Sequence, residues 1–303
     1  MRTGPYLLLR DETQPALHWK LGHELFDGLV VQVDALWDLD GFDFSDSLFL
    51  TEGQVDKAIP VREDCKYVLH NCDLTKYQGI IKNALNIQVY THDCHKRSVE
   101  KINEYTWFQP LPVLSQDGID HCVNNRTLYQ PWATNLLPGE FPIVSVNDLR
   151  SRRSNTTYWV GSICDGHQGN LVELQAFAAA SQIQGAPFVH LKIHDNEQHV
   201  QAIQISHTAP AVQGHWQVDK GYIPCRVFKN ISYGRVPMTN SLTISRLFKG
   251  YDIPYESTDM NALISSGLDV EDNITQEHLE ALMDHVRTEH TYMNRVRNIL
   301  RVL

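Results

Sequence analysis

The sequence predicts an α/β protein with two domains, and three observations lead to this expectation. Short segments rich in Val, Ile, Leu and Tyr recur between helical patterns, which is typical of parallel strands joined by crossover helices. The chain has 303 residues, about twice the size of a common single domain. Hydrophobic residues make up 42% of the chain and charged residues 20%, an ordinary globular composition.

The first half contains segments with the composition and length of strands. Each is a few residues long and is bounded by Gly, Asp or Asn. These segments are residues 29–33, 47–51, 66–70, 87–90 and 105–108. Paired prolines in residues 130–140 and a polar run at 147–157 then interrupt regular structure. We therefore expect a domain boundary between 140 and 155, with domains at 1–145 and 146–303.

The second half repeats the alternation of strands and helices. Residues 157–163 predict a strand, and Asn170 is placed to cap the helix that follows, whose apolar positions include Leu171, Leu174 and Phe177. Further strands are expected at 186–193 and 237–239, with a helix at 197–205 between them. Residues 275–303 have the apolar spacing of amphipathic helices packed on a core.

Charge and cysteine content limit the functional classes. The formal net charge is −10, which argues against a broad electrostatic surface for nucleic acid or anionic lipid. The apolar run near the N-terminus is too short for a signal sequence or a membrane span, and the six cysteines are dispersed along the chain. The sequence thus predicts a cytoplasmic protein with reduced thiols, no transmembrane segment and no nucleic-acid partner.

One candidate anion site is the turn that follows the predicted strand at 157–163. Two glycines and a capping residue precede the next helix here, where free N–H groups and the helix dipole favour an anion. Taken alone, such a turn is better explained by ordinary strand–helix capping, and the nearby segment at 221–241 is what favours an anion site. The candidate ligand residues in this region are Gly161, Ser162, Gln168, Gly169 and Asn170.

A second candidate is the segment 221–241, which is the most informative part of the sequence. It predicts a short helix, a turn at Gly234 and then an apolar strand, an arrangement used for nucleotide diphosphates in α/β enzymes. Arg226 can bind a diphosphate with two hydrogen bonds, and Lys229 adds a point charge. Asn230 and Ser232 can hold a sugar hydroxyl. The alternative is an amphipathic helix whose Arg and Lys are simply solvated.

Aromatic and flat apolar residues flank this helix. Tyr222 and Ile223 directly precede it, and Trp216 lies a few residues earlier. Such side chains can pack against a nucleobase, as they do in many ligand pockets. Trp216 is equally compatible with a place in the core.

With these segments in view, the second half resembles the C-terminal domain of GT-B-fold glycosyltransferases that use nucleotide sugars. One group of these enzymes has a terminal His-Thr-Tyr-x-x-Arg helix, which is similar to residues 290–295 here. The same group has an Arg-x-Phe-Glu segment facing the donor, and Arg226-Val-Phe-Lys229 is similar to it, with Lys in place of Glu. The resemblance implies two Rossmann-like domains facing across a cleft. It also implies a nucleotide-sugar co-substrate, with neither a cofactor nor a metal.

The same resemblance implies that the first half binds the acceptor, a glycan or another hydroxyl compound. Residues that follow strands line the ligand crevice in such folds, which makes Glu52 and His70 candidates for the catalytic base. Arg226 would stabilise the leaving diphosphate. For His70, a structural hydrogen-bonding role is an equal alternative.

Other functional classes remain open from the sequence. Asp38 and Asp40 form an Asp-x-Asp pair of the kind that holds a divalent ion in GT-A glycosyltransferases, although a solvated acidic loop is favoured this early in the chain. Histidines and cysteines in residues 92–95 lack the spacing of a zinc site. A non-catalytic nucleotide- or glycan-binding protein, a sugar-nucleotide epimerase and a hydrolase are further alternatives to the predicted metal-independent transferase.

Overall fold

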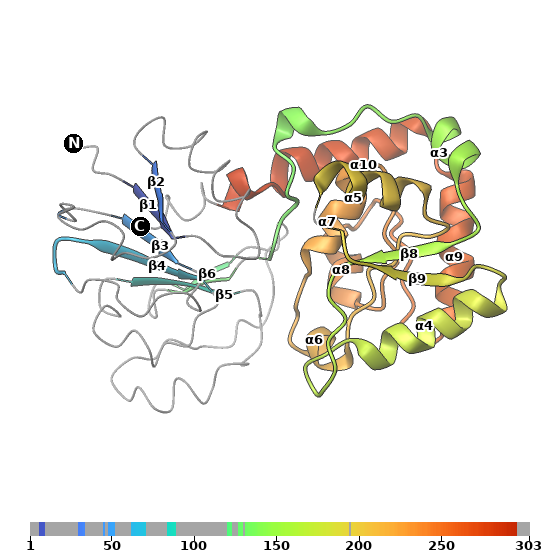
Figure 1. The fold of residues 1–303 in the computed structure, drawn as a ribbon, viewed down its shortest axis with the longest axis horizontal. Coiled ribbons are helices and arrows are strands. Elements are labelled where there is room, and N and C mark those ends of the chain that lie inside the picture. Colours follow the sequence, from blue (N-terminus) through green and yellow to red (C-terminus); the bar gives the residue numbers. More distant parts are fainter. Residues whose placement is uncertain are drawn as a thin grey trace. The chain divides into compact units, whose positions relative to one another are not determined.

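The structure, a computed structural model, describes residues 131–193 and 195–295 and shorter segments before them. These segments are Ser45 and residues 6–9, 30–33, 48–51, 62–70, 84–88, 120–122 and 127–129. The chain forms two compact units, one of Met1–Pro131 with Tyr292–Leu303 and one of Trp132–Thr291. Both contain parallel strands, so the expected α/β class is confirmed (Figure 1). The expected boundary at residue 145 falls inside the second unit.

The first unit contains a seven-stranded sheet in the order β2-β1-β3-β4-β5-β7-β6. Its neighbours pair in parallel except β6 and β7, which are antiparallel. The strand order reverses at β1, which has β2 on one side and β3 on the other, and ligands of such sheets bind beside the carboxyl ends of strands at this point. The strands are β1 (Tyr6–Leu9), β2 (Val30–Val33), β3 (Leu48–Thr51), β4 (Lys66–His70), β5 (Ala84–Gln88), β6 (Asp120–Cys122) and β7 (Thr127–Tyr129).

Three of the expected strands in this unit are confirmed by β2, β3 and β4, with bounds that agree within one residue. Strand β5 begins at Ala84 rather than at residue 87. Strand β1 was not expected. It pairs with a strand on each side, and such buried strands are short apolar runs that lack the alternation of apolar and polar residues typical of a half-exposed strand. The strand expected at 105–108 lies outside the described residues.

The second unit is built around β8 (Thr157–Val160), which pairs in parallel with β9 (Phe188–Leu191). Isolated parallel bridges join Pro210 to Met238 and Thr239 to Tyr255, so the strand expected at 237–239 is present only as bridges. The helices are α3 (Val146–Arg152), α4 (Leu171–Ile183), α5 (Asn196–Ile205), α6 (His215–Asp219), α7 (Cys225–Ser232), α8 (Leu242–Leu247), α9 (Met260–Asn273) and α10 (Gln276–Glu289), with a 3₁₀ turn, η5, at Pro138–Glu140.

Helices cover both faces of β8. Trp159 packs in one cluster with Phe177 of α4 and Leu263 of α9. The next residue, Val160, packs in a second cluster with Ile203 of α5. Successive side chains of a strand point to opposite faces, so the two clusters lie on opposite sides of the sheet, with α4 and α9 on one side and α5 on the other (Figure 1).

The helices expected from the sequence are confirmed at α4, α5, α7 and α10. Helix α9 was not expected, and its interior contains Gly267, a residue that lowers helix propensity. A Cβ at this position would lie 2.0 Å from the terminal methyl of Met238. The side chain of Met238 thus occupies the space beside Gly267, where α9 packs against the neighbouring segment.

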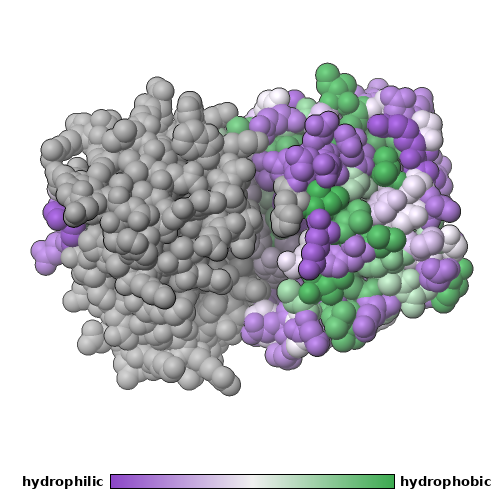
Figure 2. Space-filling model, in the orientation of Figure 1, coloured by the Kyte–Doolittle hydropathy of each residue, from purple (hydrophilic) through white to green (hydrophobic). Residues whose placement is uncertain are grey.

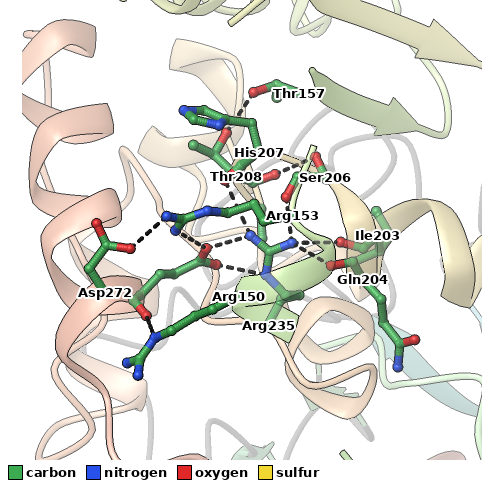
Figure 3. Close-up of polar contacts among 12 residues, drawn as sticks. Arg150, Arg153, Thr157, Ile203, Gln204, Ser206, His207, Thr208, Arg235 and Asp272 are labelled. Atoms are coloured by element: carbon green, nitrogen blue, oxygen red, sulfur yellow. Dashed lines mark hydrogen bonds and ion pairs between the residues drawn. The ribbon is translucent and has the colours of Figure 1, made fainter. Parts of the chain in front are cut away.

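A buried ion pair anchors the segment that follows α7 (Figure 3). Arg235 is 3% exposed, and its guanidinium binds both carboxylate oxygens of Glu271 on α9, with 2.9 Å between Nε and Oε1. Its Nη1 also donates to the carbonyls of Ile203, Gln204 and Ser206, at 3.0, 2.9 and 2.6 Å. Carbonyls at a helix end lack partners within the helix, so Arg235 closes the C-terminus of α5.

Two arginines of the α3 region extend this network. Arg150 donates to the carbonyls of Glu271 and Ile274 at the end of α9, at 3.1 and 2.8 Å. Arg153 forms an ion pair with Asp272 at 2.6 Å. The three arginines in Figure 3 thus join α3, α5 and α9 by side chains that bind helix ends and carboxylates.

The visible face of the second unit carries apolar and polar residues interspersed (Figure 2). Among the described residues, the large apolar side chains that are exposed are Ile143, Val172, Ile183, Val189 and Leu242. None of the described helices combines the length and the apolar character that crossing a membrane requires.

Candidate functional site

Arg226 lies at the carboxyl end of β8. Its guanidinium carbon is 3.5 Å from the centroid of the Trp159 ring, and its Nη1 donates to the carbonyl of Val160. Gly161 has φ of +133°, and a Cβ there would lie 2.3 Å from Nη2 of Arg226. The structure therefore brings together two residues of the expected site, with the exposed Ser162 next in the chain. Gly161 contributes by having no side chain.

Arg226 is a partly buried cation, and no described carboxylate forms an ion pair with it. Burial lowers the pKa of Arg226 to about 10, so the guanidinium stays protonated at neutral pH. The first turn of α7 contains no acidic residue, and the positive end of the helix dipole lies here. A buried charge without a counter-charge is costly, so this position favours an anionic ligand.

Three more basic side chains are near Arg226 or Gly161. Lys229 follows Arg226 by one helical turn, is partly exposed and forms no ion pair within the described part of the chain. His199 of α5 packs edge-on against Tyr233, with 5.4 Å between ring centroids. His190, in β9, has its Nε2 2.7 Å from the carbonyl oxygen of Gly161. The two histidines were not expected from the sequence, although His190 is the penultimate residue of a strand.

Two residues that the sequence predicted to bind the ligand lie on the buried face of α7. Asn230 donates through Nδ2 to the carbonyl of Ala209 at 3.1 Å, and Ser232 Oγ lies 2.7 Å from Oγ1 of Thr134. Both are at most 1% exposed. Their polar groups stabilise the fold instead of binding a sugar hydroxyl. Gly234 ends this segment with φ of +89°, as expected for a glycine turn.

The glycine turn before α4 is closed by its own main chain. Asn170 occupies the N-cap position as expected, but its Oδ1 accepts from the N–H of Cys164 at 2.9 Å instead of capping the helix. The N–H groups of Asn170 and Leu171 both donate to the Cys164 carbonyl, at 2.9 and 3.1 Å. A Cβ at Gly169 would lie 2.0 Å from that oxygen. These N–H groups are therefore already bonded and do not form the expected phosphate site.

Helix α6 packs against the same turn. Gln217 Nε2 donates to the carbonyl of Gln168 at 3.2 Å, and a Cβ at Gly214 would lie 1.8 Å from the carbonyl oxygen of Gly169. The first N–H of α6 donates to Oε1 of Glu173 at 2.8 Å. A carboxylate thus already occupies the first turn of α4, where an anion would be repelled.

The residues expected to pack on a nucleobase differ in exposure. Ile223 is 1% exposed and belongs to the core, so it presents no surface to a ligand. Tyr222 is partly exposed, and its carbonyl accepts from Gln213 Nε2 at 2.7 Å. Trp216 is partly exposed and lies edge-on to His167, with 6.4 Å between centroids.

The segment 290–295 begins at the C-terminal end of α10. His290 is fully buried and stacks on Phe228 of α7, with 4.8 Å between ring centroids. Its carbonyl accepts from the N–H of Thr134 at 3.1 Å, while Arg295 Nε donates to the carbonyl of Pro131 at 2.9 Å. This motif therefore supports α7 and ties together the two segments in which the chain passes from one unit to the other.

In the first unit, His70 is the last residue of β4, at the carboxyl end where ligands of such sheets bind. Glu52 directly follows the end of β3 but lies outside the described residues, as do Asp38 and Asp40. No three His, Cys, Asp or Glu side chains within the described segments are grouped so as to hold a metal ion.

Comparison of the sequence with protein-family models gives no match, and comparison with curated proteins gives none.

Proposed function

We propose that the protein is a glycosyltransferase whose second unit binds the diphosphate of a nucleotide sugar at the carboxyl end of β8. Arg226 is the observation that carries this proposal, because it is a partly buried cation with no carboxylate partner among the described residues. A guanidinium can bind two phosphate oxygens at once. Lys229, one helical turn away, supplies a second positive charge.

These groups match the chemistry of glycosyl transfer. The bond between the anomeric carbon and the diphosphate oxygen breaks, and the leaving diphosphate gains negative charge. In this proposal, Arg226 and the positive end of the α7 dipole stabilise that charge, and Lys229 in the last turn of α7 adds a second cation. A base must accept the proton of the attacking hydroxyl, and His70 and Glu52 remain the candidates for this role. The acceptor is proposed to be a glycan or another hydroxyl compound.

A thermal-shift screen of nucleotide sugars tests the proposal. A donor present at 100 times its Kd stabilises the protein by about 2.7 kcal/mol through mass action. Stabilisation by one donor, followed by transfer of its sugar to a hydroxyl acceptor, is the expected result. Absence of a shift with every donor contradicts the proposal.

Product analysis then separates transfer from the other classes. A free sugar formed without an acceptor indicates a hydrolase, and a changed sugar still bound to the nucleotide indicates an epimerase. Binding with no turnover indicates a non-catalytic nucleotide-binding protein. Transfer that stops when EDTA removes divalent ions, and also when Asp38 or Asp40 is replaced by Asn, indicates a metal-dependent reaction instead.

A further inference from the structure

His199 lies beside the helix face that carries the two cations of the candidate site. Its ring packs against Tyr233 at a centroid distance of 5.4 Å and an interplanar angle of 73°. Tyr233 follows Lys229 by four residues and Arg226 by seven, at the end of α7. Residues with this spacing share one face of a helix. The imidazole therefore faces the same strip of α7 as Lys229 and Arg226.

The electrostatic environment of His199 is positive. Burial lowers the pKa of His199 to about 3, and the charges of Lys229 and then Arg226 add to this effect. The two acidic side chains at the start of its own helix already accept hydrogen bonds, Asp195 from the N–H of Gln198 at 2.8 Å and Glu197 from Nε2 of Gln201 at 3.3 Å. Titratable or charged groups surround His199 on two elements. Helix α7 and its C-cap contribute Cys225, Arg226, Lys229 and Tyr233. Helix α5 and its N-cap contribute Asp195 and Glu197.

We propose that His199 is a third anion-binding residue of this site, which takes up a proton from solvent when a phosphate group binds to Arg226 and Lys229. The bound anion neutralises the repulsion from the two cations, so the imidazole can carry a proton and donate a charged hydrogen bond to the ligand. The inference depends on the anion site of the proposed function but not on sugar transfer. A tetrahedral oxyanion such as sulfate is therefore sufficient to test whether His199 takes up a proton on anion binding.

The proposal predicts that anions bind more tightly as the pH falls. If the imidazole in the complex titrates near the ordinary histidine value of about 6.5, the affinity at pH 5.5 is about tenfold higher than at pH 8. Protonation of His199 in the free protein contributes little to this change, because burial and two neighbouring cations keep its pKa at about 3.

Isothermal titration calorimetry with sulfate tests this prediction, because sulfate remains a dianion from pH 5.5 to 8. At constant ionic strength, the wild-type protein is expected to bind sulfate about tenfold more tightly at pH 5.5 than at pH 8. His199→Gln should bind with the same weak affinity at both values. His215→Gln is the matched control, because His215 is an exposed histidine of α6 and its replacement should preserve the pH dependence.

Equal wild-type affinities at the two pH values, or a tightening that survives in His199→Gln, overturn the assignment. NMR of the wild-type imidazole provides a readout that does not need a variant. The ring of His199 should be neutral at pH 5.5 without sulfate and protonated with saturating sulfate, and a ring that stays neutral contradicts the proposal. If Arg226→Ala binds sulfate as tightly as the wild type, Arg226 is not part of an anion site. That result contradicts the proposed function itself and not only the role of His199.

Discussion

The guanidinium of Arg226 covers the ring of Trp159, with 3.5 Å between the guanidinium carbon and the ring centroid. Trp159 is 1% exposed and belongs to the core beneath α4 and α9. A cation over an indole ring gains about 0.5–2 kcal/mol, which helps to offset the cost of partial burial. This contact explains how Arg226 is held at the carboxyl end of β8, although no carboxylate among the described residues forms an ion pair with it. The cation can therefore bind an anionic ligand.

Replacing Arg226 tests the candidate site directly. Arg226→Ala is expected to raise the donor KM or lower kcat by about 10- to 1000-fold, because it removes a charged donor from the leaving diphosphate. Steady-state kinetics with the donor found in the screen measures this effect. Arg246→Ala is the control, since Arg246 lies on the exposed surface of α8. Unchanged kinetics in Arg226→Ala would remove Arg226 from the site.

Gly161→Ala should disturb the site through contact with Arg226. The added Cβ would lie 2.3 Å from Nη2 and forces the guanidinium away from the strand end. We expect donor affinity to fall at least about tenfold, as for loss of one charged hydrogen bond. Gly166→Ala separates this contact from backbone strain, because Gly166 also has positive φ, +87°, but has no atom within 4 Å of its Cβ position. Equal affinity losses in the two variants would argue for strain alone.

The buried pair of Arg235 and Glu271 should contribute strongly to stability. Glu271→Gln leaves the Arg235 charge buried without a carboxylate and is expected to lower the unfolding free energy by about 3–5 kcal/mol. Asp272→Asn disrupts a neighbouring pair whose carboxylate is 52% exposed, so its expected cost is at most about 1 kcal/mol. Urea unfolding measures both. Similar losses in the two variants would contradict the distinction between buried and exposed pairs.

Acid should destabilise the second unit through His285. Burial lowers the pKa of His285, although Glu289 and Asp284 oppose the shift, and its ring stacks on Tyr251 at a centroid distance of 5.1 Å. Below about pH 6.5 the unfolded chain binds a proton at this residue more readily than the folded chain, so the unfolding free energy falls as the pH falls.

The corresponding variant is His285→Phe, which keeps an aromatic ring but cannot titrate. It should lose less stability between pH 7 and pH 5 than the wild type does, as measured by urea unfolding at each pH. His215→Phe is the control, because His215 is an exposed histidine of α6. If the wild type and His285→Phe lose the same stability, His285 is not responsible for acid sensitivity.

Local signals in the sequence were sufficient for several elements. Helix α7 and the turn at Gly234 were predicted from polar side chains and a glycine that lie within a few residues of one another. Helix α9 was missed although Met238 packs directly against Gly267 in its interior, because this contact joins segments that are distant in sequence. The boundary between units could not be read from composition, since the chain re-enters the first unit at Tyr292.

The residues proposed from the sequence for the candidate site differ in how the structure uses them. Arg226 and Gly161 were both among the ligand residues expected from the sequence, and the structure brings them into contact. Asn230 and Ser232 were misassigned because the sequence does not say which face of α7 is buried. His199 was missed because its neighbours on α7 are distant in sequence, and only packing places it beside them.

The sequence by itself determined the α/β class, several strand and helix positions and the cationic character of α7, because these properties depend on periodicity and on residue type over short distances. Only the tertiary structure decided which polar groups are consumed by the fold. The main-chain groups of the glycine turn are bonded to one another at Cys164. Arg226, in contrast, lies over Trp159, and no carboxylate among the described residues forms an ion pair with it. The physical reason is that a polar group is available to a ligand only where packing leaves part of its hydrogen-bonding capacity unused, and packing depends on residues far apart in the chain.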